Sequence, residues 1–208
     1  MLIARKLSKR FGARTAFRDV NFQVASGQVA AVVGSNGAGK STLLRIVAAL
    51  MRPSSGDIAW RDDAKSGDAR IDENRDSELR WMCGLAAPDA PLPRELSCAE
   101  NLRFIARVRG LACDADWAAS HLERFGLRLR RDDLTGDLSS GLRARLQLAA
   151  ATLHEPKILL LDEPSANLDE AGRALLQQVL DGQRARGLVL LATNDEREAA
   201  CCDFRIEL

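Results

Sequence analysis

Residues 34–41 constrain the fold more than any other part of the chain. They read Gly-Ser-Asn-Gly-Ala-Gly-Lys-Ser, and they lie between an apolar run at 28–33 and a helical pattern at about 40–50. A strand that ends in a glycine-rich turn and passes directly into a helix is the arrangement in which backbone N–H groups surround a phosphate. The alternative is a glycine-rich turn that contains a lysine by chance. It is disfavoured because the pattern and its context agree.

The residue types in this segment suit a nucleoside triphosphate held with a divalent cation. The Lys40 ammonium is suited to the β- and γ-phosphates, and the Ser41 hydroxyl is an oxygen ligand of the kind that Mg²⁺ takes. The dipole of the helix that begins at Lys40 adds positive potential at the same place. We therefore predict that the following residues bind the nucleotide or its Mg²⁺: Gly34, Ser35, Asn36, Gly37, Ala38, Gly39, Lys40, Ser41 and Thr42.

A second functional pattern consists of acidic residues that directly follow another apolar run. Residues 158–161 are Ile-Leu-Leu-Leu, and Asp162, Glu163 and Pro164 follow them. A strand this apolar has to be buried, so both carboxylates emerge at the carboxyl edge of a parallel sheet, where nucleotides bind in such folds. Asp162 is suited to the Mg²⁺ shell, and Glu163 to orienting or deprotonating the attacking water. With Lys40 as a further catalytic residue, this pattern predicts hydrolysis of a nucleoside triphosphate.

Short apolar runs alternate with longer helical patterns along the 208 residues, which predicts one α/β domain with a mainly parallel sheet. Residues 61–77 are polar and without periodicity, so we expect a surface loop or a partly ordered insertion there. Residues 97–131 have a helical pattern and are expected to form a small helical subdomain. The expected strands are residues 2–7, 20–24, 28–33, 57–60, 157–161 and 188–192.

Composition narrows the possible functions. Lys plus Arg is 30 and Asp plus Glu is 29, a formal net charge of +1, so we expect no nucleic-acid partner. No run approaches the roughly 18 apolar residues of a membrane span, and the first residues lack a secretory signal, so we expect a cytosolic location. The five cysteines form no C-x-x-C pair, which argues against a disulfide framework or a zinc site.

A third pattern indicates which class of nucleotide-hydrolysing protein the chain resembles. Residues 138–142, Leu-Ser-Ser-Gly-Leu, precede a helical pattern, and their serines fit either a helix N-cap or a second anion site. The phosphate-loop segment, this segment, the acidic strand end and then Ser-Ala-Asn-Leu-Asp at 165–169 follow one another in the chain. This order resembles that of the ATP-binding cassette (ABC) ATPases, and the resemblance covers nearly the whole chain.

The resemblance implies an ABC-type P-loop ATPase: a mainly parallel sheet, N-terminal antiparallel strands and an inserted helical subdomain. It implies a single domain at 1–208, with a core at 1–86 and 155–208, a subdomain at about 97–140 and a signature helix at 141–154. It also implies ATP and Mg²⁺ as ligands, and a second ATPase subunit and integral membrane transporter subunits as partners. The chain would then lie peripherally on the cytoplasmic face of the membrane.

The resemblance also assigns roles to particular residues. In this family two cassettes dimerise head to tail, so Ser139, Ser140 and Gly141 of one subunit would cap the γ-phosphate held by the other. Asp169 would lie at that dimer interface. Phe11 matches the aromatic residue on which the adenine stacks. The alternative for Phe11 is an aromatic side chain of the core.

Several positions depart from the family pattern. Leu142 stands where the signature has Gln, and Ser140 where it has Gly. Asn194 replaces the switch His, and an amide can bind a γ-phosphate but cannot become cationic. Residues 85–91 occupy the place of the loop that, in this family, supplies a Gln to Mg²⁺ and the attacking water. This segment contains no Gln, and Asp89 could act in its place. We therefore expect catalysis by Glu163, Asn194 and Lys40 to be slow without a partner.

The subfamily within the ABC ATPases is predicted from one short segment. Residues 101–104, Asn-Leu-Arg-Phe, resemble a segment of export and haem-export ATPases, so the small ATPase of cytochrome c maturation is the predicted subfamily. A groove beside residues 85–96 would receive a short helix of the membrane partner. The alternative function is a non-transport ABC ATPase acting on ribosomes or DNA, which the single cassette and the lack of heptads disfavour. A GTPase is disfavoured because residues 193–196 do not form N-K-x-D.

Overall fold

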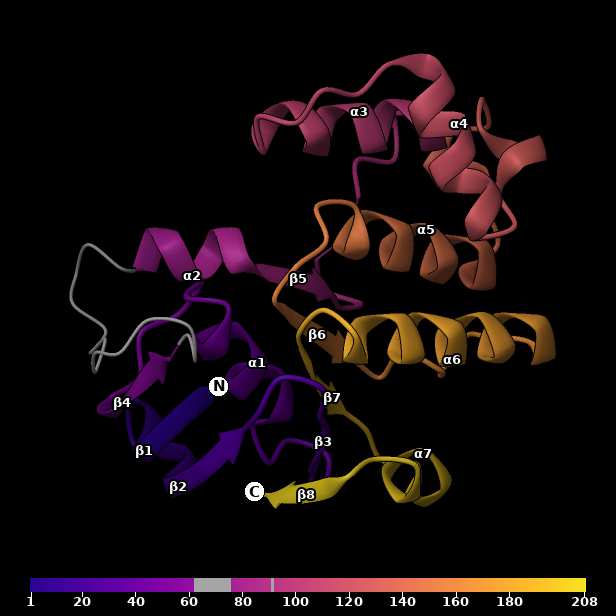
Figure 1. Ribbon diagram of the computed structural model, residues 1–208. Helices are drawn as coiled ribbons and strands as arrows, with labels where there is room; N and C mark the ends of the chain where they lie inside the picture. The colour runs from indigo at the N-terminus through magenta and orange to yellow at the C-terminus, as the bar shows by residue number, and fades with distance from the viewer. Residues whose placement is uncertain (62–75, 91) are drawn as a thin grey trace.

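The computed structural model describes residues 1–61, 76–90 and 92–208, which form two sheets flanked by helices (Figure 1). A three-stranded antiparallel sheet has the order β2-β1-β4, and a five-stranded parallel sheet has the order β5-β6-β7-β3-β8. This arrangement confirms the predicted ABC-type α/β fold. The strands are β1 (Leu2–Phe11), β2 (Arg14–Val24), β3 (Val29–Val33), β4 (Ser55–Trp60), β5 (Cys83–Ala86), β6 (Ile158–Asp162), β7 (Leu188–Ala192) and β8 (Phe204–Glu207).

The helices α3 and α4 lie together above α5, at the end of the molecule far from the antiparallel sheet (Figure 1). They fall within the predicted helical subdomain, whose limits as a separate unit remain a prediction. None of the described helices is long and apolar enough to cross a membrane. The helices are α1 (Lys40–Val47), α2 (Asp76–Met82), α3 (Cys98–Val108), α4 (Ala115–Arg124), α5 (Ser140–Thr152), α6 (Glu170–Arg184) and α7 (Glu196–Ala200).

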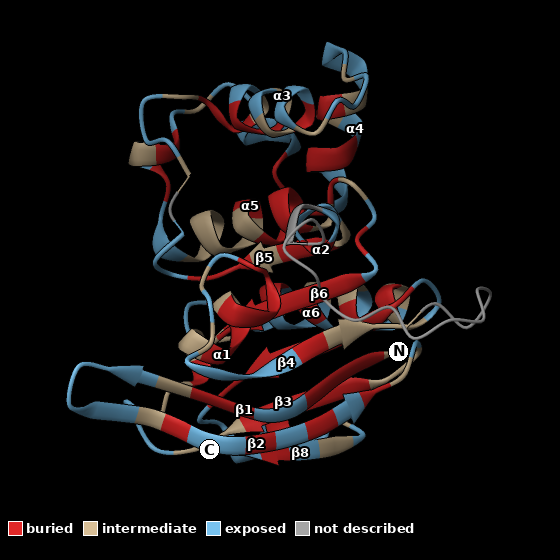
Figure 2. Ribbon diagram, turned by 90° about the vertical axis from the view of Figure 1, so that its left-hand side faces the viewer, coloured by how far each residue is buried: buried red, intermediate tan, exposed pale blue. Residues whose placement is uncertain are grey.

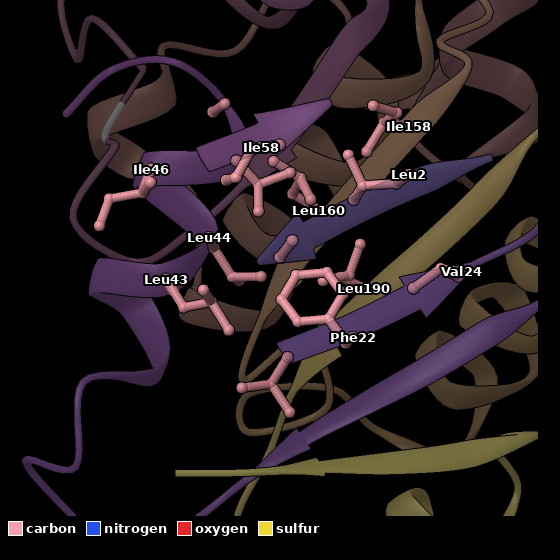
Figure 3. Close-up of a cluster of buried hydrophobic side chains, with 14 of the residues drawn as sticks. Leu2, Phe22, Val24, Leu43, Leu44, Ile46, Ile58, Ile158, Leu160 and Leu190 are labelled. Carbon is pink, nitrogen blue, oxygen red and sulfur yellow. The ribbon is translucent and has the colours of Figure 1, made fainter. Parts of the chain in front are cut away.

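Strand β6 shows how the sequence divides the core into two clusters. Successive side chains of a strand point to opposite faces of the sheet. Ile158 and Leu160 pack toward α1 and the antiparallel sheet, and Figure 3 shows them there beside Leu2 and Leu190. Leu159 and Leu161 belong to the other cluster, which includes residues of α5 and α6. Both faces of β6 are therefore buried, as its uninterrupted apolar sequence predicts (Figure 2).

The hairpin of β1 and β2 is longer than the sequence indicates. The sequence predicts strands at 2–7 and 20–24, but β1 extends to Phe11 and β2 begins at Arg14, and these two residues pair directly across the turn. Gly12 takes a φ of 58° there, a left-handed conformation that glycine adopts readily. Apolar periodicity does not reveal this part, because residues 10–15 are all exposed and show no alternation of buried and exposed side chains (Figure 2). The extension brings Phe11 and Arg14 toward the glycine-rich loop.

Other elements were also misjudged from the sequence. α1 ends at Val47 rather than near residue 50, because Ala49 takes a positive φ of 54°. β5, α2 and α7 are short, and periodicity over four to seven residues does not identify an element. The expected loop at 61–77 lies mainly outside the described residues, at 62–75, and its last two residues begin α2.

Candidate nucleotide site

The glycine-rich loop connects β3 to α1, as predicted. Gly37 and Gly39 have φ values of 82° and 103°, and Gly39 is the N-cap residue of α1. A Cβ atom on Gly39 would lie 2.9 Å from Cδ1 of Phe17, so side-chain bulk is excluded there as well as strained. These conformations direct the loop backbone around the N-terminus of α1, whose dipole favours an anion.

Lys40 is almost buried, and three oxygen atoms hold its ammonium. Nζ donates to the carbonyl of Gly34 at 2.9 Å, to that of Ser35 at 3.4 Å and to Oδ1 of Asn194 at 2.6 Å. Nδ2 of Asn194 donates in turn to Oδ1 of Asn36 at 2.7 Å. The structure thus joins the loop lysine to the residue in the switch position, two groups that are 154 residues apart in sequence.

The acidic end of β6 lies beside the same cluster. β6 pairs in parallel with β7 so that Asp162 is opposite Ala192, and Glu163 and Asn194 therefore emerge at one sheet edge. The backbone N–H of Asn194 donates to Oε2 of Glu163 at 3.4 Å. Glu163 has a φ of 48°, a conformation that costs free energy for a side chain of this size. Its own N–H donates to the carbonyl of Ala192 at 2.8 Å, which helps to hold that conformation.

A further carboxylate approaches this edge from α7. Burial raises the pKa of Glu198 above its usual range, and the negative charges of Asp195 and Glu163 add to the rise. Nothing in the apolar pattern of the sequence points to Glu198, because α7 is short and mostly exposed.

A cavity of about 480 Å³, the nucleotide cavity, opens beside the loop. Phe11, with 48% of its surface exposed, lies at it, which fits a stacking role better than the alternative of a core side chain. Ser41 and Asp162 both line the cavity, and a hydroxyl with a carboxylate is a donor set that suits Mg²⁺ beside a phosphate. The cavity is lined by Phe11, Arg14, Ala16, Asn36, Gly37, Gly39, Lys40, Ser41, Thr42, Asp162 and Glu163.

The remaining loop residues of the predicted set lie next to the nucleotide cavity rather than in its lining. Gly34 and Ser35 contribute the carbonyls that hold Lys40, and the N–H of Ala38 donates to the carbonyl of Ser35 at 3.0 Å. Sequence reasoning missed Arg14, whose Nη2 donates to the Gly37 carbonyl at 3.2 Å. The only sequence signal for Arg14 is its place opposite Phe11 in a hairpin.

The signature residues lie apart from the nucleotide cavity. Oγ of Ser139 accepts a hydrogen bond from the N–H of Leu142 at 3.3 Å, so Ser139 is the N-cap of α5. Its hydroxyl proton can still be donated to another acceptor. Ser140 is exposed and Gly141 is half-buried at the same helix end. No signature residue lines the nucleotide cavity of the same chain, as expected if these residues act on a second subunit's nucleotide.

Asp169 has two partners within the chain. Its Oδ1 accepts a hydrogen bond from Nη2 of Arg145 at 2.6 Å and from the N–H of Gly172 at 2.8 Å. The contact with Arg145 and the bond from Gly172 lower the pKa of this carboxyl. The side chain remains 70% exposed, so it is accessible to a second subunit.

A second cavity of about 330 Å³, the acid-side cavity, lies on the other side of Asp162 and Glu163. Both carboxylates line it together with residues of α5 and of the loop after β5. The sequence offers Asp89 as a replacement for the missing Gln of that loop. The structure does not support this, because the Asp89 carboxylate forms an ion pair with Arg45 on α1 and lines neither cavity.

The chain is similar to ABC transporter proteins in sequence and to ATP-binding cassettes in fold. The profile of the ABC transporter family matches residues 17–166. An aliphatic sulfonates import ATP-binding protein of Pseudomonas syringae is 36% identical, over 100% of this chain and 72% of that protein. One of Pseudomonas aeruginosa is 37% identical, over 100% and 71%. A dimeric ATP-binding cassette, solved in a post-hydrolysis state with ADP and Pi, has a TM-score of 0.85 at 24% identity, over 100% of this chain and 94% of that one.

Proposed function

The chain belongs to the ABC transporter family as an ATP-binding, ATP-hydrolysing subunit, and we propose that it works as a dimer on separate membrane subunits. The observation that carries this proposal is the cluster at the end of β6 and β7. There Lys40, Asn194 and Glu163 are joined by hydrogen bonds beside a cavity that also contains an aromatic side chain. The membrane subunits would place the chain peripherally on the cytoplasmic face.

Each residue of the cluster has a distinct part in hydrolysis. Lys40 neutralises charge on the β- and γ-phosphates, and Phe11 stacks on the adenine. Ser41 and Asp162 would hold Mg²⁺, which would neutralise charge on the phosphates. Glu163 takes the proton of the attacking water, and its strained backbone keeps the carboxylate at the sheet edge. Asn194 donates an amide hydrogen bond to the γ-phosphate as negative charge moves there.

Dimerisation completes the site. Ser139, Ser140 and Gly141 lie at the N-terminus of α5, where the dipole and the free hydroxyl protons suit a phosphate of the facing subunit. Asp169 remains exposed beside them. The structural neighbour reported above was solved as a dimer, which supports this arrangement.

The membrane partner would occupy an apolar groove between the segment after α1, β5 with the loop that follows it, α3 and α5, here called the docking groove. It has a volume of about 250 Å³ and is lined by Leu50, Leu85, Ile105, Arg109 and Gln147 among others. Leu50 is 59% exposed, and Trp81, over whose ring Arg109 lies, is 52% exposed. Apolar side chains this exposed around a groove fit an amphipathic helix of the partner.

We infer the direction of transport from the relatives rather than from the predicted subfamily. Both sulfonate relatives are named for import, and neither supports the haem-export assignment drawn from residues 101–104. We therefore favour an import system and leave cytochrome c maturation without support.

The trapped dimer tests the proposal. Glu163→Gln should bind Mg·ATP but not hydrolyse it, because an amide cannot take the proton of water. On size exclusion this variant should elute as a dimer with ATP and as a monomer with ADP. Adding Lys40→Ala to Glu163→Gln should abolish the shift. Hydrolysis by Glu163→Gln at the wild-type rate would remove Glu163 from the proposed role.

A further inference from the structure

The docking groove and the acid-side cavity are adjacent and share two lining residues, Leu92 and Gln147. Leu92 is apolar, so Gln147 is the shared residue whose side chain can form hydrogen bonds. One amide therefore faces both the surface proposed for the membrane partner and the cavity that contains Asp162 and Glu163. This position is independent of the nucleotide cavity, which Gln147 does not line.

The Gln147 amide holds the loop that separates these two spaces. Its Nε2 donates to the carbonyl of Ala87 at 3.1 Å. Ala87 follows β5, and the parallel pairing of Ala86 with Leu161 places that carbonyl beside the acidic end of β6. The loop residues that line the acid-side cavity at this point are Ala86, Ala87 and Pro88, whose side chains offer no hydrogen-bonding group. Polar chemistry at this wall of the cavity must come from the backbone or from α5.

Helix α5 connects this contact to the signature end. Arg143 and Gln147 are one turn apart and line the same cavity, so they lie on one face of α5. Nη1 of Arg143 donates to the carbonyl of Leu138, just before the N-cap Ser139. A movement of the loop after β5 would therefore reach the N-terminus of α5 and the β6 carboxylates through the same helix.

We propose that Gln147 is a positioning residue for ATP hydrolysis. By holding the Ala87 carbonyl, Gln147 couples the docking groove to Glu163. The inference rests on the proposed function, because it assigns a role within that reaction. A partner helix in the docking groove would press on Leu92 and on the loop, and the amide of Gln147 transfers that displacement to the acid-side cavity. If the hydrogen bond from Gln147 to Ala87 only stabilised the loop, its removal would lower stability without changing the rate of ATP hydrolysis.

The test compares Gln147→Met, which keeps the length of the side chain but removes the amide, with Gln177→Met. Gln177 is an exposed glutamine of α6 whose amide donates to Asp181, away from both cavities, and it serves as the matched control. ATP hydrolysis is measured on the isolated chain, and ATP affinity is measured by calorimetry in a Glu163→Gln background. We expect Gln147→Met to lower kcat about three- to tenfold, with KM and ATP affinity within about twofold. Gln177→Met should leave all three unchanged.

ATP-dependent hydrogen exchange of the loop distinguishes the proposed role of Gln147 from a purely stabilising one. In the Glu163→Gln background, Mg·ATP should change amide exchange at residues 85–90, and Gln147→Met should abolish that change. Equal ATP-dependent exchange with and without the amide would overturn the inference, as would an unchanged kcat in Gln147→Met. A loss of kcat that follows a lowered unfolding midpoint would also overturn it, because stability would then explain the effect.

The two proposals fail differently. If the wild-type chain neither binds nor hydrolyses ATP, the proposed function fails, and with it the role of Gln147. If wild type hydrolyses ATP and Gln147→Met does so at the same rate, only the inference about Gln147 fails.

Discussion

Asn194→Ala separates a γ-phosphate contact from nucleotide binding. The substitution removes the hydrogen bonds to Lys40 at 2.6 Å and to Asn36 at 2.7 Å, but it keeps the backbone N–H that donates to Glu163. Lys40 retains the carbonyls of Gly34 and Ser35, so its ammonium should stay in place. We therefore expect ATP affinity to fall by no more than about fivefold, because an ordinary neutral hydrogen bond contributes about 1 kcal/mol.

Turnover should fall much further. A hydrogen bond to a charged group contributes about 1.5–3 kcal/mol. At about 1.4 kcal/mol for each factor of ten, losing one in the transition state lowers kcat roughly 10- to 150-fold. Phosphate release measures kcat, and calorimetry measures affinity. Asn194→His should equal or exceed wild type, because an imidazole can also become cationic. Equal rates for wild type, Asn194→Ala and Asn194→His would refute the reasoning, as would a loss of kcat matched by an equal loss of affinity.

Three further predictions follow from the same structure. Lys40→Ala should weaken ATP binding by calorimetry, since it removes the charge aimed at the phosphates, and unchanged affinity would overturn the site. Phe11→Ala should weaken ATP binding while Phe11→Trp preserves it, because stacking needs only an aromatic face; equal affinities would leave Phe11 without a role. Burial, with Arg109 nearby, lowers the pKa of His154 from 6.5 to about 4, so the unfolded chain takes up a proton first and stability is lost as pH falls through that window. His154→Gln keeps a donor for the Cys83 carbonyl and should make the unfolding midpoint less sensitive to acid between about pH 7 and pH 4; an equal loss in both proteins would contradict this.

The motifs could be located from the sequence, but their connections could not. The glycine-rich loop and the acidic strand end are local patterns, so residue types and spacing were sufficient to single out Lys40 and Glu163 as candidates. The bond between Lys40 and Asn194 depends on which strands are neighbours in the sheet, and a single sequence does not contain that order. Gln147 was missed for a related reason, since on α5 alone it is an ordinary polar residue. Asp89 was misjudged because Arg45, its ion-pair partner, is far from it in sequence.

The nucleotide cavity takes its walls from both sheets: the β1–β2 hairpin contributes Phe11 and Arg14, and the parallel sheet contributes the loop after β3 and the end of β6. Bound ATP would therefore contact both the antiparallel and the parallel sheet, which otherwise pack against each other through apolar side chains. A ligand that binds only the folded state, at a concentration a thousand times its dissociation constant, adds about 4 kcal/mol to stability. The supply of ATP would then govern the resistance of this subunit to proteolysis as well as its rate of work.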